Sequence, residues 1–375
     1  MHIGPIARAT IRTSIVLGMR LLVQAGTLLL VARMLGPGQF GAFTGVTALA
    51  VVLGTLSTFG THLVLMGEMS RDPARRGQIL SYALPMTLLC SGVLLAAFML
   101  ICIGVLHGNG VPWDVLVVIG VAEILLQPFV GLLVSEQLAF ERTARSQLLQ
   151  TLPLALRFAA AAAVFWLRSP EPLIAYGYGY CAAAAIALAL AMARMPEPWP
   201  HPRVWHWPAR PERRESLGYA VLNVTAMGPA ELDKILAAKL LSLPAAGLYA
   251  AGARVIGAAT LPVVALMLSA LPRLFRESSD QSSRMARLLK WIFGATALYS
   301  LVLAAVLWWC APLFVWLLGS KYAGVDGVIR WLCIAVPGMA MRIAAGSALM
   351  ALGKPWVRAG FEVIGLVVLT VAVMV

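Results

Sequence analysis

Long apolar runs, separated by short polar or basic loops, follow one another along the whole chain. A helix needs about 20 mainly apolar residues to cross a bilayer, because each residue advances it by about 1.5 Å. Eleven runs are long enough, and we predict a membrane-spanning helix for each. They occupy residues 11–34, 43–67, 78–106, 115–135, 148–167, 173–193, 217–241, 247–271, 289–318, 328–351 and 356–375.

The composition agrees with an all-α polytopic membrane protein. Of 375 residues, 61% are hydrophobic and only 12% are charged, and the mean hydropathy is +0.86. Soluble domains carry about 25% charged residues. A net charge of +13 would suggest nucleic-acid binding in a soluble chain. Here the charge lies in the loops, so we expect membrane lipids and no nucleic acid as partners.

The loop charges predict the orientation of the chain. Alternate loops hold 19 lysines and arginines on the side of the N-terminus and 4 on the other side. Basic loops stay in the cytoplasm. We therefore predict a multi-pass protein of the cytoplasmic membrane with a cytoplasmic N-terminus. The first apolar run lacks a small-residue cleavage site, so no cleavable signal peptide is expected.

A proline-rich segment divides the chain. Residues 194–216, "RMPEPWPHPRVWHWPARPERRES", hold six prolines, which argue against a helix because proline lacks a backbone N–H. The arginines and tryptophans are typical of a cytoplasmic linker at the lipid interface. The linker separates an N-lobe, residues 1–193 with six predicted spans, from a C-lobe, residues 217–375 with five.

A faint internal repeat relates the two lobes. "LVARMLGPGQFGAF" (30–43) aligns with "LAAKLLSLPAAGLY" (236–249), and each copy joins the first and second spans of its lobe. Both copies follow a span that enters from the predicted cytoplasmic side, which favours parallel repeats about an axis along the membrane normal. The C-lobe is then expected to have six spans, and we expect its last, the twelfth of the scheme, to be missing.

Nine charged residues lie deep inside the predicted spans. Each Asp, Lys or Arg costs about 2.5–3.5 kcal/mol at the centre of a membrane helix, so such residues are candidates for function. Spans three, six and nine have no charge in their central parts, which indicates one polar interior shared by some of the helices. The nine are Arg20, Glu123, Arg157, Glu231, Asp233, Lys234, Arg254, Arg342 and Glu362.

The first span carries a polar stripe. Thr13, Arg20, Gln24 and Thr27 recur at helical spacing and share one face. Arg20 lies roughly 13 Å into the span. We interpret this face as the lining of a cavity, and snorkelling of Arg20 to the headgroups is the alternative.

Three further arginines are candidates for the same cavity. Arg157 and Arg254 also lie deep in their spans, and we predict that they face the cavity with Arg20. Arg342 is a weaker candidate, because a structural ion pair with Glu362 would explain it equally well.

The seventh span combines a helix breaker with three charges. Pro229 should bend or break the helix near Gly228, which is tolerated at membrane depth only beside protein or a water-filled cavity. Glu231 and Lys234 are three residues apart and can pair, whereas Asp233 points away from Glu231. The segment is either a neutralised pair that holds the bend or an interior polar site whose carboxylate could bind a proton or a cation. Lys234 is a further basic candidate for the cavity.

Ion coupling is the other role that these charges allow. Asp233 is the first candidate to bind a proton or a sodium ion, with Glu231 and Glu123 as alternates, because burial moves the pKa of a carboxyl towards neutrality. The five cysteines and five histidines are scattered without a CxxC motif. We therefore expect no metal site and no cofactor beyond H⁺ or Na⁺.

Two segments resemble a known family. "ELDKILAAKLLSLPAAGLYAAGARVIG" (231–257) resembles the seventh-to-eighth span signature of polysaccharide flippases, and "VARMLGPGQFGAFTGVTAL" (31–49) resembles their first-to-second span signature. These are the Wzx-type O-antigen and exopolysaccharide flippases of the MOP superfamily, which also contains the MATE drug exporters. The resemblance extends from about residue 10 to the end.

The resemblance implies two six-helix bundles that form a V around a central cavity, lined mainly by spans one, two, seven and eight. It implies alternating access and movement of an undecaprenyl-pyrophosphate-linked oligosaccharide across the bacterial inner membrane, for O-antigen (lipopolysaccharide) or exopolysaccharide biosynthesis. Polysaccharide polymerases and glycosyltransferases would be its partners. Arg20, Asp233, Lys234 and Arg254 fall on the lining helices.

Two rival functions remain. A MATE-like cation-coupled exporter of drugs or metabolites would favour acidic or aromatic cavity residues, whereas five of the nine deep charges are basic. A membrane-embedded glycan-modifying enzyme would need a sizeable outward loop or a catalytic His/Asp cluster, and the sequence shows neither. We therefore expect a transporter rather than an enzyme.

Overall fold

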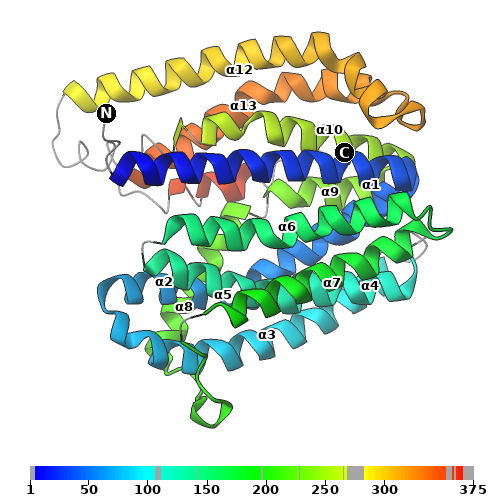
Figure 1. Ribbon diagram of the computed structural model, residues 1–375. Coiled ribbons are helices and arrows are strands. Elements are labelled where there is room, and N and C mark those ends of the chain that lie inside the picture. The colour runs from blue at the N-terminus through cyan, green and yellow to red at the C-terminus, as the bar shows by residue number, and fades with distance from the viewer. Residues whose placement is uncertain are drawn as a thin grey trace. The chain divides into compact units, whose positions relative to one another are not determined.

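Helices cover most of the predicted spans in a computed structural model of the chain (Figure 1). It describes residues 5–105, 111–140, 142–195, 197–227, 229–264, 266–267, 283–351, 357–358 and 360–365. Within these ranges every regular element is a helix, and eight helical segments are long and apolar enough to cross a membrane. The prediction of an all-α polytopic membrane protein is confirmed.

The chain forms two compact units. Unit 1 comprises Met1–Leu35 and Ala42–Leu243, and unit 2 comprises Gly36–Gly41 and Pro244–Val375. Most of unit 1 consists of α1 (Pro5–Ser57), α2 (Thr61–Arg71), α3 (Arg76–Val105), α4 (Trp113–Gly120), α5 (Gln127–Ala139), α6 (Thr143–Trp166), α7 (Pro172–Ala193), α8 (Arg210–Met227) and α9 (Pro229–Leu240). Unit 2 contains α10 (Leu243–Ala259), α12 (Ser283–Leu318) and α13 (Val325–Ala351).

The predicted spans and these helices differ in three places. The first span and the start of the second form one helical run, α1, bent at Gly36, whose φ of +70° favours glycine, and the last residues of the second span lie in α2. The seventh span is covered by α8 and α9, and Gly228, near which we expected the helix to bend or break, lies outside the described residues. Most of the eleventh span, 356–375, also lies outside them.

The proline-rich linker was expected to be free of helix, and this was wrong at its C-terminal end. Helix α8 begins at Arg210, and Pro211 lies in its first turn. Proline is tolerated there, because the N–H groups of the first turn have no partner within the helix. A short 3₁₀ turn, η3 (Pro202–Val204), is the other helical element of the linker in the described residues.

Unit 1 has its core where α2, α3 and α5 meet. Leu65, Leu80 and Leu132, one from each helix, are completely buried in one cluster. Helix α6 packs beside α5 and α7, and α4 packs beside α7 (Figure 1). These contacts bury the face of α6 that carries Arg157 and Ala161.

Unit 2 is built around the pair α12 and α13, which lie side by side (Figure 1). Its core contains Met267, Ile292 and Ala344. Large apolar side chains remain on the outside of α12, where Trp309 is 82% exposed and Trp316 is 73% exposed. Such surfaces are rare in water but stable in lipid, so they agree with a membrane protein.

Candidate functional site

Three polar side chains meet in the interior of unit 1. The Arg157 Nη2 atom lies 2.7 Å from Glu123 Oε1, and the Tyr180 hydroxyl donates a hydrogen bond to the same oxygen. The guanidinium carbon of Arg157 lies 3.7 Å from the centre of the Tyr180 ring, which is a close cation–π contact. All three residues are buried, so we call them the buried triad.

The position of Glu123 depends on an irregular turn between α4 and α5. Residues Val121–Leu126 form a π-helical segment, η2, in which the Gln127 N–H bonds to the Ala122 carbonyl. Pro128 follows in the first turn of α5 and has no N–H for the carbonyl four residues earlier, so a wider turn relieves the conflict. Gly54 of α1 packs against the Glu123 carbonyl, where any Cβ would collide with the oxygen.

The buried triad neutralises its own charges. An isolated charge in the interior would be unstable, and the ion pair with its hydroxyl donor offsets this cost. The Arg157 Nε is buried and has no hydrogen-bond partner in the described part of the chain. From the sequence we expected separate roles for Glu123 and Arg157, in coupling and in substrate binding, whereas the structure brings them into contact.

Arg20 meets a different kind of partner. Its Nη1 donates a hydrogen bond of 2.9 Å to the Oε1 atom of Gln150 on α6, and its side chain is partly buried. Gln24, one turn further along α1, is exposed. Gln150 and Arg157 are seven residues apart, so they lie on one face of α6. The contact of Arg20 with Gln150 and the buried triad with Arg157 therefore lie along the same face of α6.

The charges of α9 form a local group, as their spacing predicts. Lys234 Nζ lies 2.9 Å from Glu231 Oε2, and Asp233 Oδ1 accepts a hydrogen bond of 2.7 Å from the Lys234 N–H. All three side chains are partly buried. The two acids thus contact different groups of Lys234: Asp233 accepts from its main-chain N–H, and Glu231 pairs with its ammonium group.

The two remaining arginines belong to unit 2. The Arg254 guanidinium lies 5.7 Å from the centre of the Phe40 ring. Arg342 Nη1 lies 2.7 Å from Glu362 Oε2, and the Glu362 side chain is only 9% exposed. The structural alternative that we gave for Arg342 is thus the geometry found.

Sequence reasoning missed three members of these contacts, which are Tyr180, Gln150 and Phe40. Tyr180 lies in the sixth span, which has no central charge, and a tyrosine among apolar residues gives no sign of a buried carboxylate beside it. Gln150 lies near the start of the fifth span, where a polar residue is ordinary. A polar stripe on α6 through Gln150 and Arg157 was the one signal available.

The fold is shared with solved transporters. An inward-facing multidrug resistance MATE family transporter of the MOP superfamily superposes with a TM-score of 0.73 at 11% identity, over 91% of this chain and 83% of that chain. An outward-facing MATE family transporter of the MOP superfamily superposes with a TM-score of 0.60 at 12% identity, over 93% of this chain and 84% of that chain. A MOP superfamily transporter from Pyrococcus furiosus Vc1 (DSM3638) superposes with a TM-score of 0.63 at 13% identity, over 95% of this chain and 84% of that chain.

At these identities the likeness establishes the fold alone, so the chain is a polytopic membrane protein with the fold of the MOP superfamily. Residues 6–278 match the family described as "Polysaccharide biosynthesis protein". The chain therefore belongs to that family, in agreement with the resemblance noted in its sequence. No curated protein sequence matches it.

Proposed function

We propose that the protein flips an undecaprenyl-pyrophosphate-linked oligosaccharide from the inner to the outer leaflet of a bacterial inner membrane. The family supports a role in polysaccharide biosynthesis, and the fold supports transport by alternating access. The substrate would serve O-antigen or exopolysaccharide biosynthesis, with polymerases and glycosyltransferases as partners. An anionic lipid pyrophosphate needs a basic, hydrated site for its head while its tail stays in lipid.

The observation that carries this proposal is the pairing of the five deep basic residues. Three of them are neutralised by a carboxylate: Arg157 by Glu123, Lys234 by Glu231 and Arg342 by Glu362. The other two have neutral partners in the described part of the chain.

Arg20 bonds to the amide of Gln150, and Arg254 lies over the ring of Phe40. Both therefore keep a positive charge that an anionic substrate can complement. Arginine suits a pyrophosphate because its planar fork donates two hydrogen bonds at once and stays charged. In the Pyrococcus furiosus transporter, reverse polarity of the binding pocket suggests a different function. A basic site in this chain would likewise differ from a site for organic cations.

The test replaces the two arginines in the native host. Arg20→Ala and Arg254→Ala should each abolish surface glycan while lipid-linked precursor accumulates in the cell, and Arg20→Lys should already reduce it because lysine offers a point charge only. Arg145→Ala, at an exposed position in the first turn of α6, is the matched control. Normal surface glycan in both alanine variants, at equal protein levels, would contradict the proposal.

A further inference from the structure

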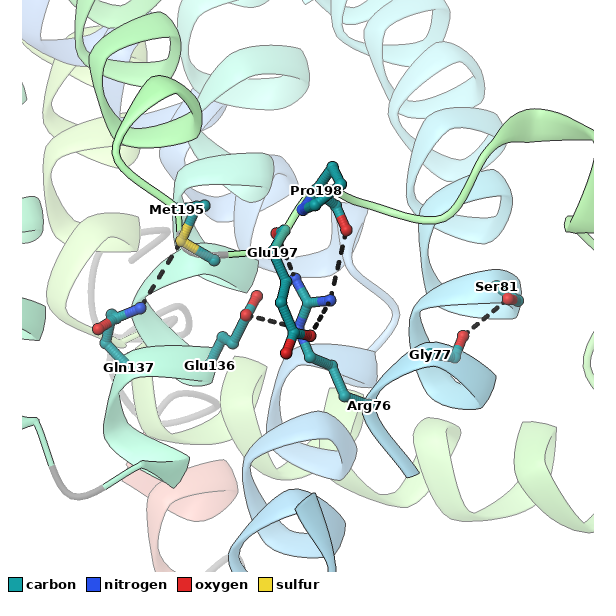
Figure 2. Close-up of polar contacts among 8 residues, drawn as sticks. All are labelled: Arg76, Gly77, Ser81, Glu136, Gln137, Met195, Glu197 and Pro198. Carbon is teal, nitrogen blue, oxygen red and sulfur yellow. Dashed lines mark hydrogen bonds and ion pairs between the residues drawn. The ribbon is translucent and has the colours of Figure 1, made fainter. Parts of the chain in front are cut away.

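The linker between the predicted lobes is fastened to unit 1 by one arginine. Arg76, at the start of α3, donates from Nε to Glu136 Oε1 at 2.6 Å and from Nη2 to the Glu197 carbonyl at 2.9 Å. Its Nη1 donates to Glu197 Oε2 at 3.2 Å and to the Pro198 carbonyl at 3.4 Å. Figure 2 shows the guanidinium between α5 and the linker. All three nitrogens of Arg76 are therefore used.

This contact lies out of water. The side chains of Arg76 and Glu136 are 9% and 1% exposed, although the Glu197 side chain is 70% exposed. Hydrogen bonds to charged groups are stronger than those between neutral groups, and losing one costs more when the partner is buried and would be left alone. A buried guanidinium that bonds to two main-chain carbonyls fixes the path of the linker as well as its charge.

Aromatic packing adds a second attachment. We call residues 197–209 the strap. The Trp199 ring lies 5.9 Å from the Phe129 ring of α5, and both Trp199 and Trp205 pack against the core cluster of unit 1. The sequence predicted a linker that rests at the lipid interface, whereas these two indoles turn inward. Trp207 remains exposed.

A third attachment uses a gap in the hydrogen bonding of α3. Pro85 lies inside α3 and has no N–H for the Ser81 carbonyl four residues earlier. The His206 N–H of the strap donates to that carbonyl at 3.2 Å. The Ser81 hydroxyl is occupied elsewhere, because it donates to the Gly77 carbonyl (Figure 2). The strap thus completes the backbone hydrogen bonding of α3.

The strap continues directly into α8. The Ala209 N–H donates to Glu212 Oε2 at 2.6 Å, which is one half of a capping box at the helix start. Further along α8, Ser216 and Ala220 are buried in unit 1. A fixed strap therefore holds the start of α8, the helix that leads to α9 with Glu231, Asp233 and Lys234.

We propose that Arg76 is a positioning residue that locks the strap to unit 1, and that the proline-rich linker is not the flexible joint of the protein. The lock keeps α8 and α9 in register with the rest of unit 1. The inference that transport requires this lock rests on the proposed function. The inference that Arg76 holds the strap in place does not.

Hydrogen–deuterium exchange of the full-length purified protein tests the lock. In the wild type, peptides that cover residues 197–209 should exchange slowly, and Arg76→Ala should speed them roughly tenfold or more. Arg76→Lys should do the same, because one ammonium group cannot reach α5 and both strap carbonyls. Arg71→Ala is the control, since Arg71 pairs with Glu68 at the surface. Equal strap exchange in the wild type and Arg76→Ala would overturn the lock.

Surface glycan in the native host tests the requirement. Arg76→Ala and Arg76→Lys should lower surface glycan severalfold at equal amounts of membrane-inserted protein, whereas Arg71→Ala should not. Full surface glycan in Arg76→Ala would overturn the requirement. A wild-type protein that moves no lipid-linked glycan would instead overturn the proposed function, and the exchange result would still decide the lock.

Discussion

Glu123, Arg157 and Tyr180 share one buried contact, so a change at any of them alters the balance of charge around the other two. Arg157 sits against the carboxylate on one side and the tyrosine ring on the other. The carboxylate thus has two partners and the guanidinium one countercharge. Breaking such a pair costs more than forming it contributes, because one charge is left in the interior.

Glu123→Gln should therefore destabilise the protein by about 3–5 kcal/mol, since it leaves the buried Arg157 without a countercharge. Tyr180→Phe keeps the ring and should cost only about 1 kcal/mol. The melting temperature of the detergent-solubilised protein measures both effects. Glu171→Gln, at an exposed position before α7, is the control. An unchanged melting temperature for Glu123→Gln would show that the pair does not stabilise unit 1.

At the scale of elements, three charged residues lie close together near the start of α9. Pro229 begins α9, and Glu231, Asp233 and Lys234 follow in its first two turns. A carboxylate near a helix N-terminus is favoured by the helix dipole. Asp233 takes a main-chain N–H and Glu231 takes Lys234, so the two acids are distinct groups.

Asp233→Asn tests ion coupling, in which Asp233 binds H⁺ or Na⁺. The variant keeps the shape of the side chain but cannot exchange a proton, so surface glycan should be lost while the protein remains in the membrane. Immunoblotting of membranes and surface glycan staining measure the two quantities. Asp114→Asn, at the start of α4, serves as the comparison. Transport at the wild-type level in Asp233→Asn would leave Asp233 with a structural role.

Local patterns predicted what local forces decide. Apolar runs identified the helices, and a spacing of three predicted the Lys234–Glu231 pair. The pairing of Arg76 with Glu136 and Glu197 was missed, because its partners lie 60 and 121 residues away and Glu136 falls one position beyond the predicted fourth span. The sequence analysis also missed the π-helical turn at Glu123, because this turn depends both on Pro128 and on close contact with Gly54.

At the scale of the whole molecule, family and fold agree on a membrane protein of polysaccharide biosynthesis with the architecture of MOP transporters. The charge pairing then separates two kinds of basic residue. Arg157, Lys234 and Arg342 belong to ion pairs, and Arg20 and Arg254 have neutral partners in the described residues. This division favours an anionic substrate over an organic cation.

Reconstitution tests that claim most directly. Purified protein is placed in vesicles that contain an undecaprenyl-pyrophosphate oligosaccharide with a fluorescent label on its glycan, and a membrane-impermeant reductant is added outside. In vesicles with the wild type, we expect the reductant to quench label from both leaflets, because the lipid is flipped outward. Arg20→Ala and Arg254→Ala should each slow the quenching of the inner-leaflet label by at least roughly tenfold, which corresponds to the loss of one charged contact. The claim of an anionic substrate would be contradicted if vesicles with the wild-type protein took up an organic cation dye while quenching stayed confined to the outer leaflet.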